Sequence, residues 1–142
     1  MSEGRRFCTF RLDDLLLGME VAKVQEVLRH HNVTRVPLAQ PSVAGLINLR
    51  GQIVTAVNLR RAFALPARPE RGSPLNVIVR TESGAISLLV DEIGDVVEVG
   101  DEAFEPPPET LPTPERTFIT GVYKLEHELL LVLDSEAMRR AA

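Results

Sequence analysis

Apolar residues in this chain come in short runs that proline or glycine breaks at close intervals. Of the 142 residues, ten are proline and nine are glycine. Valine-rich runs between such breakers favour strands, and no sustained alternation of strands with long helices accompanies them. Only 4% of the residues are aromatic and tryptophan is absent, so the core must be built mainly from aliphatic side chains. The sequence therefore predicts a mainly β protein.

Alternating apolar and polar positions predict nine or ten short strands in two blocks. The first block has strands at residues 8–12, 15–21 and 33–36 and a hairpin within 45–58, and the second has strands at 75–80, 85–90, 93–99, 118–125 and 129–133. Gly51 is expected to supply a positive φ in the turn of the 45–58 hairpin. Such strands suit either two small antiparallel β-barrels or one irregular sandwich.

Helices are expected to be few and short. Four apolar residues have helical spacing: Val21, Val24, Val27 and Leu28. That spacing predicts a helix with Glu26 on its open face. Residues 59–65 favour a helical turn, and Asp134 or Ser135 can cap a C-terminal helix over residues 135–140. Residues 104–114 contain five prolines and are predicted to form an extended loop, because proline cannot donate to a β-ladder.

Charge and cysteine content exclude several classes of protein. The net charge of −4 argues against non-specific binding to nucleic acid. The single cysteine, Cys8, cannot form an internal disulfide, which fits a reducing compartment. No apolar stretch approaches the roughly 18 residues of a membrane span, and the N-terminus does not resemble a secretory signal. We therefore expect a cytoplasmic protein.

No catalytic or metal-binding motif stands out. His30 and His31 are neighbours that point in different directions, and no Cys-x-x-Cys or His-Glu-x-x-His pattern frames them or His127. Cys8 alternates with apolar residues and is expected to be a buried apolar side chain, because no base can be placed beside it from the sequence.

Two acidic clusters could in principle bind a metal ion or act as acid and base. They are Asp91, Glu92 and Asp95, and Asp101, Glu102 and Glu105. Solvated charges in turns between strands explain them more simply. The glycines are scattered singly, without the spacing of a phosphate-binding loop. The sequence thus predicts neither an enzyme nor a cofactor.

The sequence Asn48-Leu49-Arg50-Gly51 places an arginine at the turn between two apolar strands. A solvated arginine is ordinary at such a turn. The functional interpretation is that a rigid turn presents the guanidinium to a protein partner, because its planar fork makes several hydrogen bonds while its stem packs.

A series of motifs resembles the CheW family. They are Val24-Gln25-Glu26-Val27, Val36-Pro37, Gly45-Leu46-Ile47-Asn48-Leu49-Arg50-Gly51-Gln52-Ile53-Val54, Asn58-Leu59-Arg60, Leu89-Val90-Asp91-Glu92-Ile93, Asp95-Val96, Gly121 and Leu131-Val132-Leu133-Asp134. The resemblance runs from about Phe7 to Met138. Each motif alone is only moderately specific, but in this order and at these spacings they are together a strong match.

The resemblance implies a single CheW-like domain over residues 1–142, built from two intertwined five-stranded SH3-like β-barrels on a shared core. The first barrel would cover roughly residues 7–65 and the second roughly 75–133, with the two interleaved. It also implies a non-enzymatic adaptor, monomeric when free. Such an adaptor binds the cytoplasmic tip of a chemoreceptor (a methyl-accepting chemotaxis protein) and the regulatory domain of a CheA-type histidine kinase, in arrays at the membrane.

The resemblance also assigns roles to residues. Arg50 matches an arginine implicated in the receptor contact, and Val24 and Val96 match positions of the groove that takes the receptor tip. Glu26 could meet the kinase, together with exposed apolar residues at the barrel ends. Two glycines are expected to shape the backbone: Gly45 and Gly51.

Three positions depart from the family pattern and leave partner specificity open: Leu17 (often aromatic), Asn58 (often Asp) and Ser87 (often Gly). Two alternative functions also remain. One is a generic β-barrel module that binds an unrelated peptide or small ligand. The other is a small enzyme that uses Cys8 or the two acidic clusters, the first of which contains Asp91.

Overall fold

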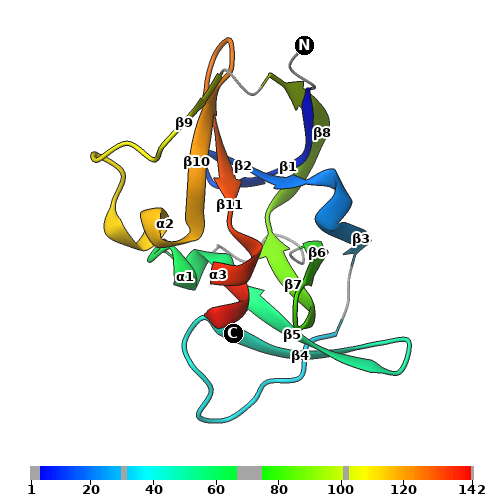
Figure 1. Ribbon diagram of the computed structural model, residues 1–142. Coiled ribbons are helices and arrows are strands. Elements are labelled where there is room, and N and C mark those ends of the chain that lie inside the picture. Colours follow the sequence, from blue (N-terminus) through cyan, green and yellow to red (C-terminus); the bar gives the residue numbers. More distant parts are fainter. Residues whose placement is uncertain (1–3, 30–31, 67–74, 101–102, 142) are drawn as a thin grey trace.

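Two β-sheets and a few short helices make up the fold of this protein, as Figure 1 shows. The computed structural model describes residues 4–29, 32–66, 75–100 and 103–141. The prediction of a mainly β protein is confirmed. Within these ranges, no helix is long and apolar enough to cross a membrane.

The six-stranded sheet occupies the upper part of Figure 1 and has the order β8-β1-β2-β11-β10-β9. Its strands are β1 (Arg5–Leu12), β2 (Leu15–Glu20), β8 (Glu92–Val99), β9 (Phe104–Glu105), β10 (Ile119–Lys124) and β11 (Leu129–Leu133). Neighbouring strands are antiparallel except for β11 and β2, which are parallel.

The five-stranded sheet lies below it and has the order β3-β6-β7-β5-β4. Its strands are β3 (Val24–Arg29), β4 (Val43–Leu49), β5 (Gln52–Asn58), β6 (Leu75–Thr81) and β7 (Gly84–Val90). Only the pair of β5 and β7 is parallel. The hairpins of β4 with β5 and of β6 with β7 were both predicted from the sequence.

Each sheet combines strands from both halves of the chain. The strands β1 and β2 pair into one sheet with β8 to β11, whereas β3, β4 and β5 pair into the other with β6 and β7. The two halves of the chain are thus interleaved in both sheets. The chain crosses between the sheets at a 3-10 helix, η1 (Val21–Lys23), and again at Asp91, the single residue between β7 and β8.

The five-stranded sheet curls until its two edges meet. Thr34, which follows β3, bridges to Leu46 on β4: each backbone N–H donates to the other's carbonyl oxygen, at N···O distances of 2.7 and 2.8 Å. Gly45 permits this approach, because a Cβ at that position would lie 2.2 Å from the Thr34 oxygen. A small core fills the curl: Ile47, Leu49, Val54, Ala56 and Ile78.

The main core lies between the sheets and takes side chains from both. It includes Phe10, Leu12, Leu17 and Met19 from one sheet and Val57, Val77, Val79 and Leu88 from the other. Short α-helices in the described part of the chain complete the fold: α1 (Leu59–Ala62), α2 (Thr113–Phe118) and α3 (Ser135–Arg140). Asp134 caps α3 as predicted, accepting hydrogen bonds from the N–H groups of Glu136 and Ala137.

The predicted helix over residues 21–28 is wrong. Only η1 is helical there, and β3 follows it as an edge strand paired with β6. Along β3, Val24, Glu26 and Leu28 are half-buried and alternate with exposed residues, which is the period of a strand. The helical spacing arose because the register shifts between Val24 and Glu26, so that Val24 packs against the main core and Leu28 against the small core.

Other expectations also need correction. Of the predicted strand at 33–36, only Thr34 makes a bridge. The predicted loop at 104–114 contains the two-residue strand β9, and α2 begins at Thr113. Pro114 fits the first turn of α2, where a missing N–H leaves no intrahelical bond unmade. Cys8 is half-buried rather than buried. His30, His31, Asp101 and Glu102 lie outside the described residues.

Candidate functional site

The turn between β4 and β5 is a two-residue loop. Leu49 pairs with Gln52, which leaves Arg50 and Gly51 at the tip, and their φ angles are +52° and +87°. Positive φ at both positions is what a type I′ hairpin turn requires. The Asn48 side-chain oxygen accepts a hydrogen bond from the Gly51 N–H at 2.9 Å. The positive φ predicted for Gly51 is confirmed, and the turn is tightly constrained.

Arg50 extends from this turn and forms a two-pronged ion pair with Glu26 on β3. The N···O distances are 2.8 Å from Nη1 and 2.6 Å from Nη2. Because β3 and β4 are the opposite edges of the five-stranded sheet, this pair joins the edges on the outside, as the Thr34–Leu46 bridge joins them through the backbone. The Arg50 side chain is still 69% exposed.

Glu26 is therefore not on the open face of a helix. It lies on a strand, half-buried, and holds the arginine that the family resemblance links to a different partner. The hydrogen bonds to the Glu26 carboxylate raise the pKa of Arg50 above its usual value. The structure thus brings together two residues that the sequence placed in separate sites.

Val24 and Val96 stand on different sheets. Val24, on β3, is half-buried against the main core, whereas Val96, on β8, is 53% exposed. Figure 1 shows β3 and β8 on the same side of the molecule. Each strand carries a further exposed apolar side chain, Val27 on β3 and Ile93 on β8.

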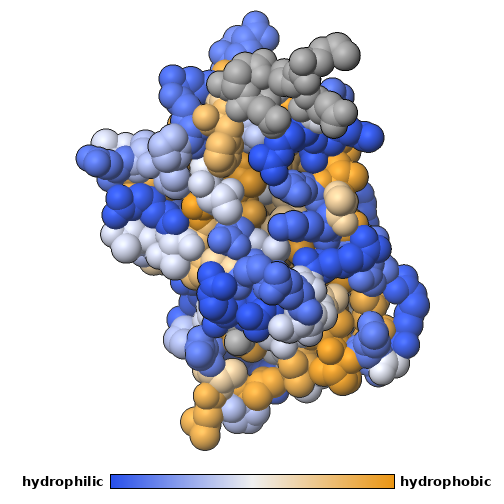
Figure 2. Space-filling model, in the orientation of Figure 1, coloured by the Kyte–Doolittle hydropathy of each residue, from blue (hydrophilic) through white to orange (hydrophobic). Residues whose placement is uncertain are grey.

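A separate apolar surface covers the lower end of the molecule. Figure 2 shows it below the five-stranded sheet in the same orientation. Val36 and Leu38, in the segment before β4, and Ile53 on β5 are exposed, with Leu38 fully so. Apolar side chains grouped at a surface commonly mark a protein interface.

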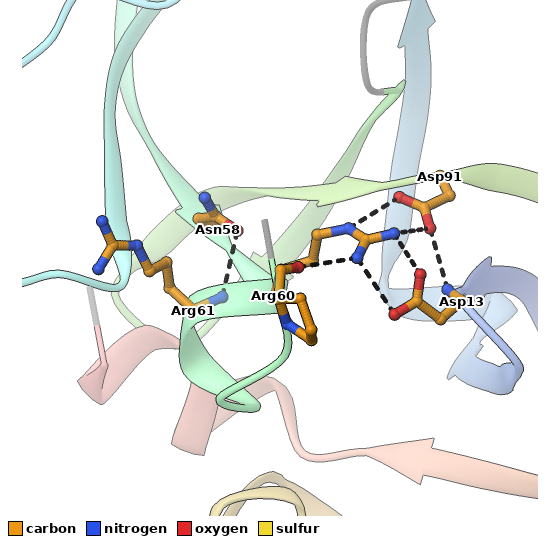
Figure 3. A network of polar contacts seen from close by, with 6 residues as sticks. Asp13, Asn58, Arg60, Arg61 and Asp91 are labelled. Atoms are coloured by element: carbon orange, nitrogen blue, oxygen red, sulfur yellow. Dashed lines mark hydrogen bonds and ion pairs between the residues drawn. The ribbon is translucent and has the colours of Figure 1, made fainter. Parts of the chain in front are cut away.

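The polar network around Arg60 was not predicted from the sequence. Figure 3 shows its guanidinium between the carboxylates of Asp13 and Asp91. Arg60 Nη2 lies 2.6 Å from Asp91 Oδ2, and the two side chains are only 11% and 15% exposed. Asp91 is therefore not the solvated turn charge that we expected. No local pattern could have revealed this network, because its members are 47 and 31 residues from Arg60.

The three departures from the family pattern have structural roles. Asn58 caps α1 by accepting a hydrogen bond from the Arg61 N–H at 3.3 Å (Figure 3). Ser87 is buried and accepts a hydrogen bond from the Asn76 side-chain amide at 3.0 Å. Leu17 is fully buried in the main core. All three changes are accommodated inside the fold or at a helix end.

The catalytic alternative finds little support. Burial raises the pKa of the Cys8 thiol, which disfavours the reactive thiolate. Asp91 is held by Arg60. Among the described residues, no three histidine, cysteine or acidic side chains are grouped to hold a metal ion. The surface instead carries an arginine on a constrained turn and exposed apolar side chains on two strands, and these features suit binding.

Comparison with known proteins agrees with a binding role. The family model described as "CheW-like domain" matches residues 6–142. The chemotaxis protein CheW of Treponema pallidum is 31% identical over 136 residues, which are 93% of this chain and 80% of that protein. The CheW of Klebsiella aerogenes is 28% identical over 135 residues, 95% of this chain and 81% of that protein.

A solved structure is similar over nearly the same length. The crystal structure of the scaffolding protein TtCheW from Thermoanaerobacter tengcongensis superposes with a TM-score of 0.84 at 25% identity. The match covers 93% of this chain and 90% of that one.

Proposed function

This chain belongs to the CheW-like family of chemotaxis scaffold proteins, and from that premise we propose that it couples chemoreceptor tips to a CheA-type histidine kinase. The observation that carries the proposal is the exposed guanidinium of Arg50 on a constrained turn, within a family match that spans nearly the whole chain. The protein would act without catalysis, in the cytoplasm, at receptor arrays.

The proposed receptor surface combines Arg50 with the apolar residues of β3 and β8. A chemoreceptor tip is a helical hairpin, and an amphipathic helix docks its apolar face into an apolar groove. Val24 and Val96 would form walls of such a groove, and Val27 and Ile93 extend its exposed apolar area. Arg50 would then bind polar groups of the receptor at the rim, through the guanidinium N–H donors that Glu26 does not engage.

The proposed kinase surface is the apolar lower end of the molecule, where Leu38 and Ile53 are exposed. Glu26 remains a proposed kinase contact, but its ion pair with Arg50 has a consequence. A partner that draws away either side chain breaks this ion pair. Binding at one surface can therefore be coupled to the other through this pair.

The test is calorimetry with two titrants, a receptor tip fragment and the regulatory domain of a CheA-type kinase from the same organism. Arg50→Glu is expected to weaken receptor binding about tenfold or more, as at interface hot spots, and to change kinase binding less, through the lost pair with Glu26 alone. Arg116→Glu is the matched control, because Arg116 is an exposed arginine on α2, at the other side of the molecule in Figure 1.

A charge swap distinguishes a direct contact between Arg50 and the receptor from an indirect effect of the ion pair on the closure of the sheet. The double variant Glu26→Arg, Arg50→Glu restores an ion pair between the sheet edges but moves the guanidinium. If the receptor contacts Arg50 directly, the double variant still binds the receptor weakly. Recovery of receptor binding would show that the ion pair acts only by closing the sheet. Wild-type protein that is folded yet binds neither titrant would favour a CheW-like module with a different partner.

A further inference from the structure

Arg60 stands at the junction of the two sheets. It belongs to α1, which follows β5 of the five-stranded sheet. Asp13 lies in the turn between β1 and β2 of the six-stranded sheet, and Asp91 is the residue at which the chain passes from one sheet to the other. One guanidinium therefore joins both sheets and the crossover between them, as Figure 3 shows.

The contacts at this junction are numerous and directional. Arg60 Nη1 donates to Asp13 Oδ2 at 3.1 Å and to the Pro66 carbonyl oxygen at 3.0 Å, and Nη2 donates to Asp91 at 2.6 Å. The backbone takes part as well, because the Asp13 N–H donates to Asp91 Oδ2 and the Asp91 N–H to the Arg11 carbonyl oxygen, both at 2.9 Å. Burial alone would lower the pKa of Arg60, but the bonds to Asp13 and Asp91 raise it above its usual value.

The first part of the strand that leaves this junction is held by its pairing with β1 and by polar contacts rather than by a core. Residues 92–96, the first part of β8, are exposed along their whole length, so no core packing holds them in place. β8 is an edge strand that pairs only with β1, and its register shifts between Cys8 and Phe10. The Thr9 hydroxyl donates to the Asp95 carbonyl oxygen at 2.5 Å. The position of this segment therefore depends on its backbone pairing with β1 and on polar contacts, and the contacts of Asp91 lie at its start.

We propose that Arg60 is a positioning residue, which through Asp91 and Asp13 sets the placement of β8 against β3 and so the spacing between Val96 and Val24. The consequence for receptor binding rests on the proposed function, whereas the placement of β8 does not. Arg60 would not touch the receptor. Its loss would leave two facing carboxylates, Asp91 only 15% exposed, and their repulsion would loosen the start of β8.

The first measurement needs no partner. Spin labels at Gln25→Cys on β3 and Asp95→Cys on β8, both exposed, would report the distance between the strands in a Cys8→Ser background. Pulsed electron paramagnetic resonance should give a narrow distribution for the parent and a broader or shifted one for Arg60→Gln. Asp13→Asn alters the more exposed of the two carboxylates and should change the distance distribution less than Arg60→Gln does. It is the substitute test variant if Arg60→Gln does not fold.

Val54→Ala is the control for a general loss of stability, because Val54 lies in the small core inside the five-stranded sheet, away from the junction. It should leave the distance distribution narrow. An unchanged distribution in folded Arg60→Gln, or in Asp13→Asn should the former not fold, would overturn the proposal. So would an equal broadening in Val54→Ala.

The second measurement is receptor binding by calorimetry. If the competent placement of β8 falls to about a tenth of the population, the apparent affinity falls about tenfold. Arg60→Gln should weaken binding to the receptor tip by that order, and Val54→Ala should not. A broadened distribution with unchanged receptor affinity would uphold the role of Arg60 in placing β8 and refute its link to the receptor. Wild-type protein that fails to bind the receptor tip would refute the proposed function, while the distance measurement still decides the role of Arg60.

Discussion

Replacing Gly45 with alanine is expected to open the closure of the five-stranded sheet. The Gly45 φ is +153°, and a Cβ there would lie 2.2 Å from the Thr34 carbonyl oxygen and 2.7 Å from a methyl carbon of Val33. Carbon and oxygen atoms normally approach to about 3.3 Å. The Thr34 backbone must therefore retreat by about 1 Å, since a carbonyl oxygen cannot swing aside as a side chain can.

The retreat breaks the two bonds between Thr34 and Leu46, whose N···O distances are 2.7 and 2.8 Å. Each backbone hydrogen bond contributes about 1 kcal/mol net. The unfavourable φ of an L-residue adds about 1–2 kcal/mol. We therefore expect a loss of roughly 3–4 kcal/mol in the free energy of unfolding, a large part of the roughly 5–15 kcal/mol typical of a domain.

Urea denaturation measures this loss. With a slope of about 2 kcal/mol per molar urea, the midpoint should fall by roughly 1.5–2 M while the slope itself stays constant. Gly51→Ala is the matched control, because Gly51 also has a positive φ, +87°, but has no heavy atom within 4 Å of an added Cβ. It should lose only about 1 kcal/mol. Equal losses in the two variants would refute the reasoning that the approach of Thr34 requires the glycine.

Two further predictions concern titratable side chains. Burial raises the pKa of Glu115 above 4.5, and its Oε2 has no hydrogen-bond partner among the described residues. The folded state therefore holds the proton more tightly than the unfolded state, so stability should fall as pH rises from 4.5 through the raised pKa. Glu115→Gln should be more stable than wild type at pH 7 and lose this advantage below pH 4.5. A difference in urea midpoint between variant and wild type that stays constant with pH would contradict this prediction. Burial also raises the pKa of Cys8, so iodoacetamide should alkylate it at pH 8 more slowly than a cysteine in a short peptide, and an equal rate would count against that raised pKa.

Local patterns were sufficient for the hairpins. The alternation in residues 45–58 and 75–90 predicted β4 with β5 and β6 with β7, and Gly51 marked the turn that carries Arg50. Residues close in sequence decide such features, because side chains alternate along a strand and few residues adopt a positive φ.

Residue 26 shows where this reasoning failed. The register of β3 against β6 shifts between Val24 and Glu26, so Val24 packs against the main core whereas Leu28 packs against the small core. This irregularity broke the two-residue apolar period of the strand and left helical spacing in its place. A charge is tolerated at Glu26 because Arg50, on the opposite edge of the curled sheet, supplies the counter-charge.

Composition, alternation and motif order were enough to predict the mainly β class, the paired strands and the turn with Arg50 exposed, and the resemblance to the CheW family implied that the two halves of the chain interleave. The ion pairs of Glu26 with Arg50 and of Asp91 with Arg60 became visible only in the folded chain. Turns and strands follow from neighbouring residues, whereas burial and ion pairing depend on which distant segments the fold brings together, and one sequence without its fold does not specify those distances.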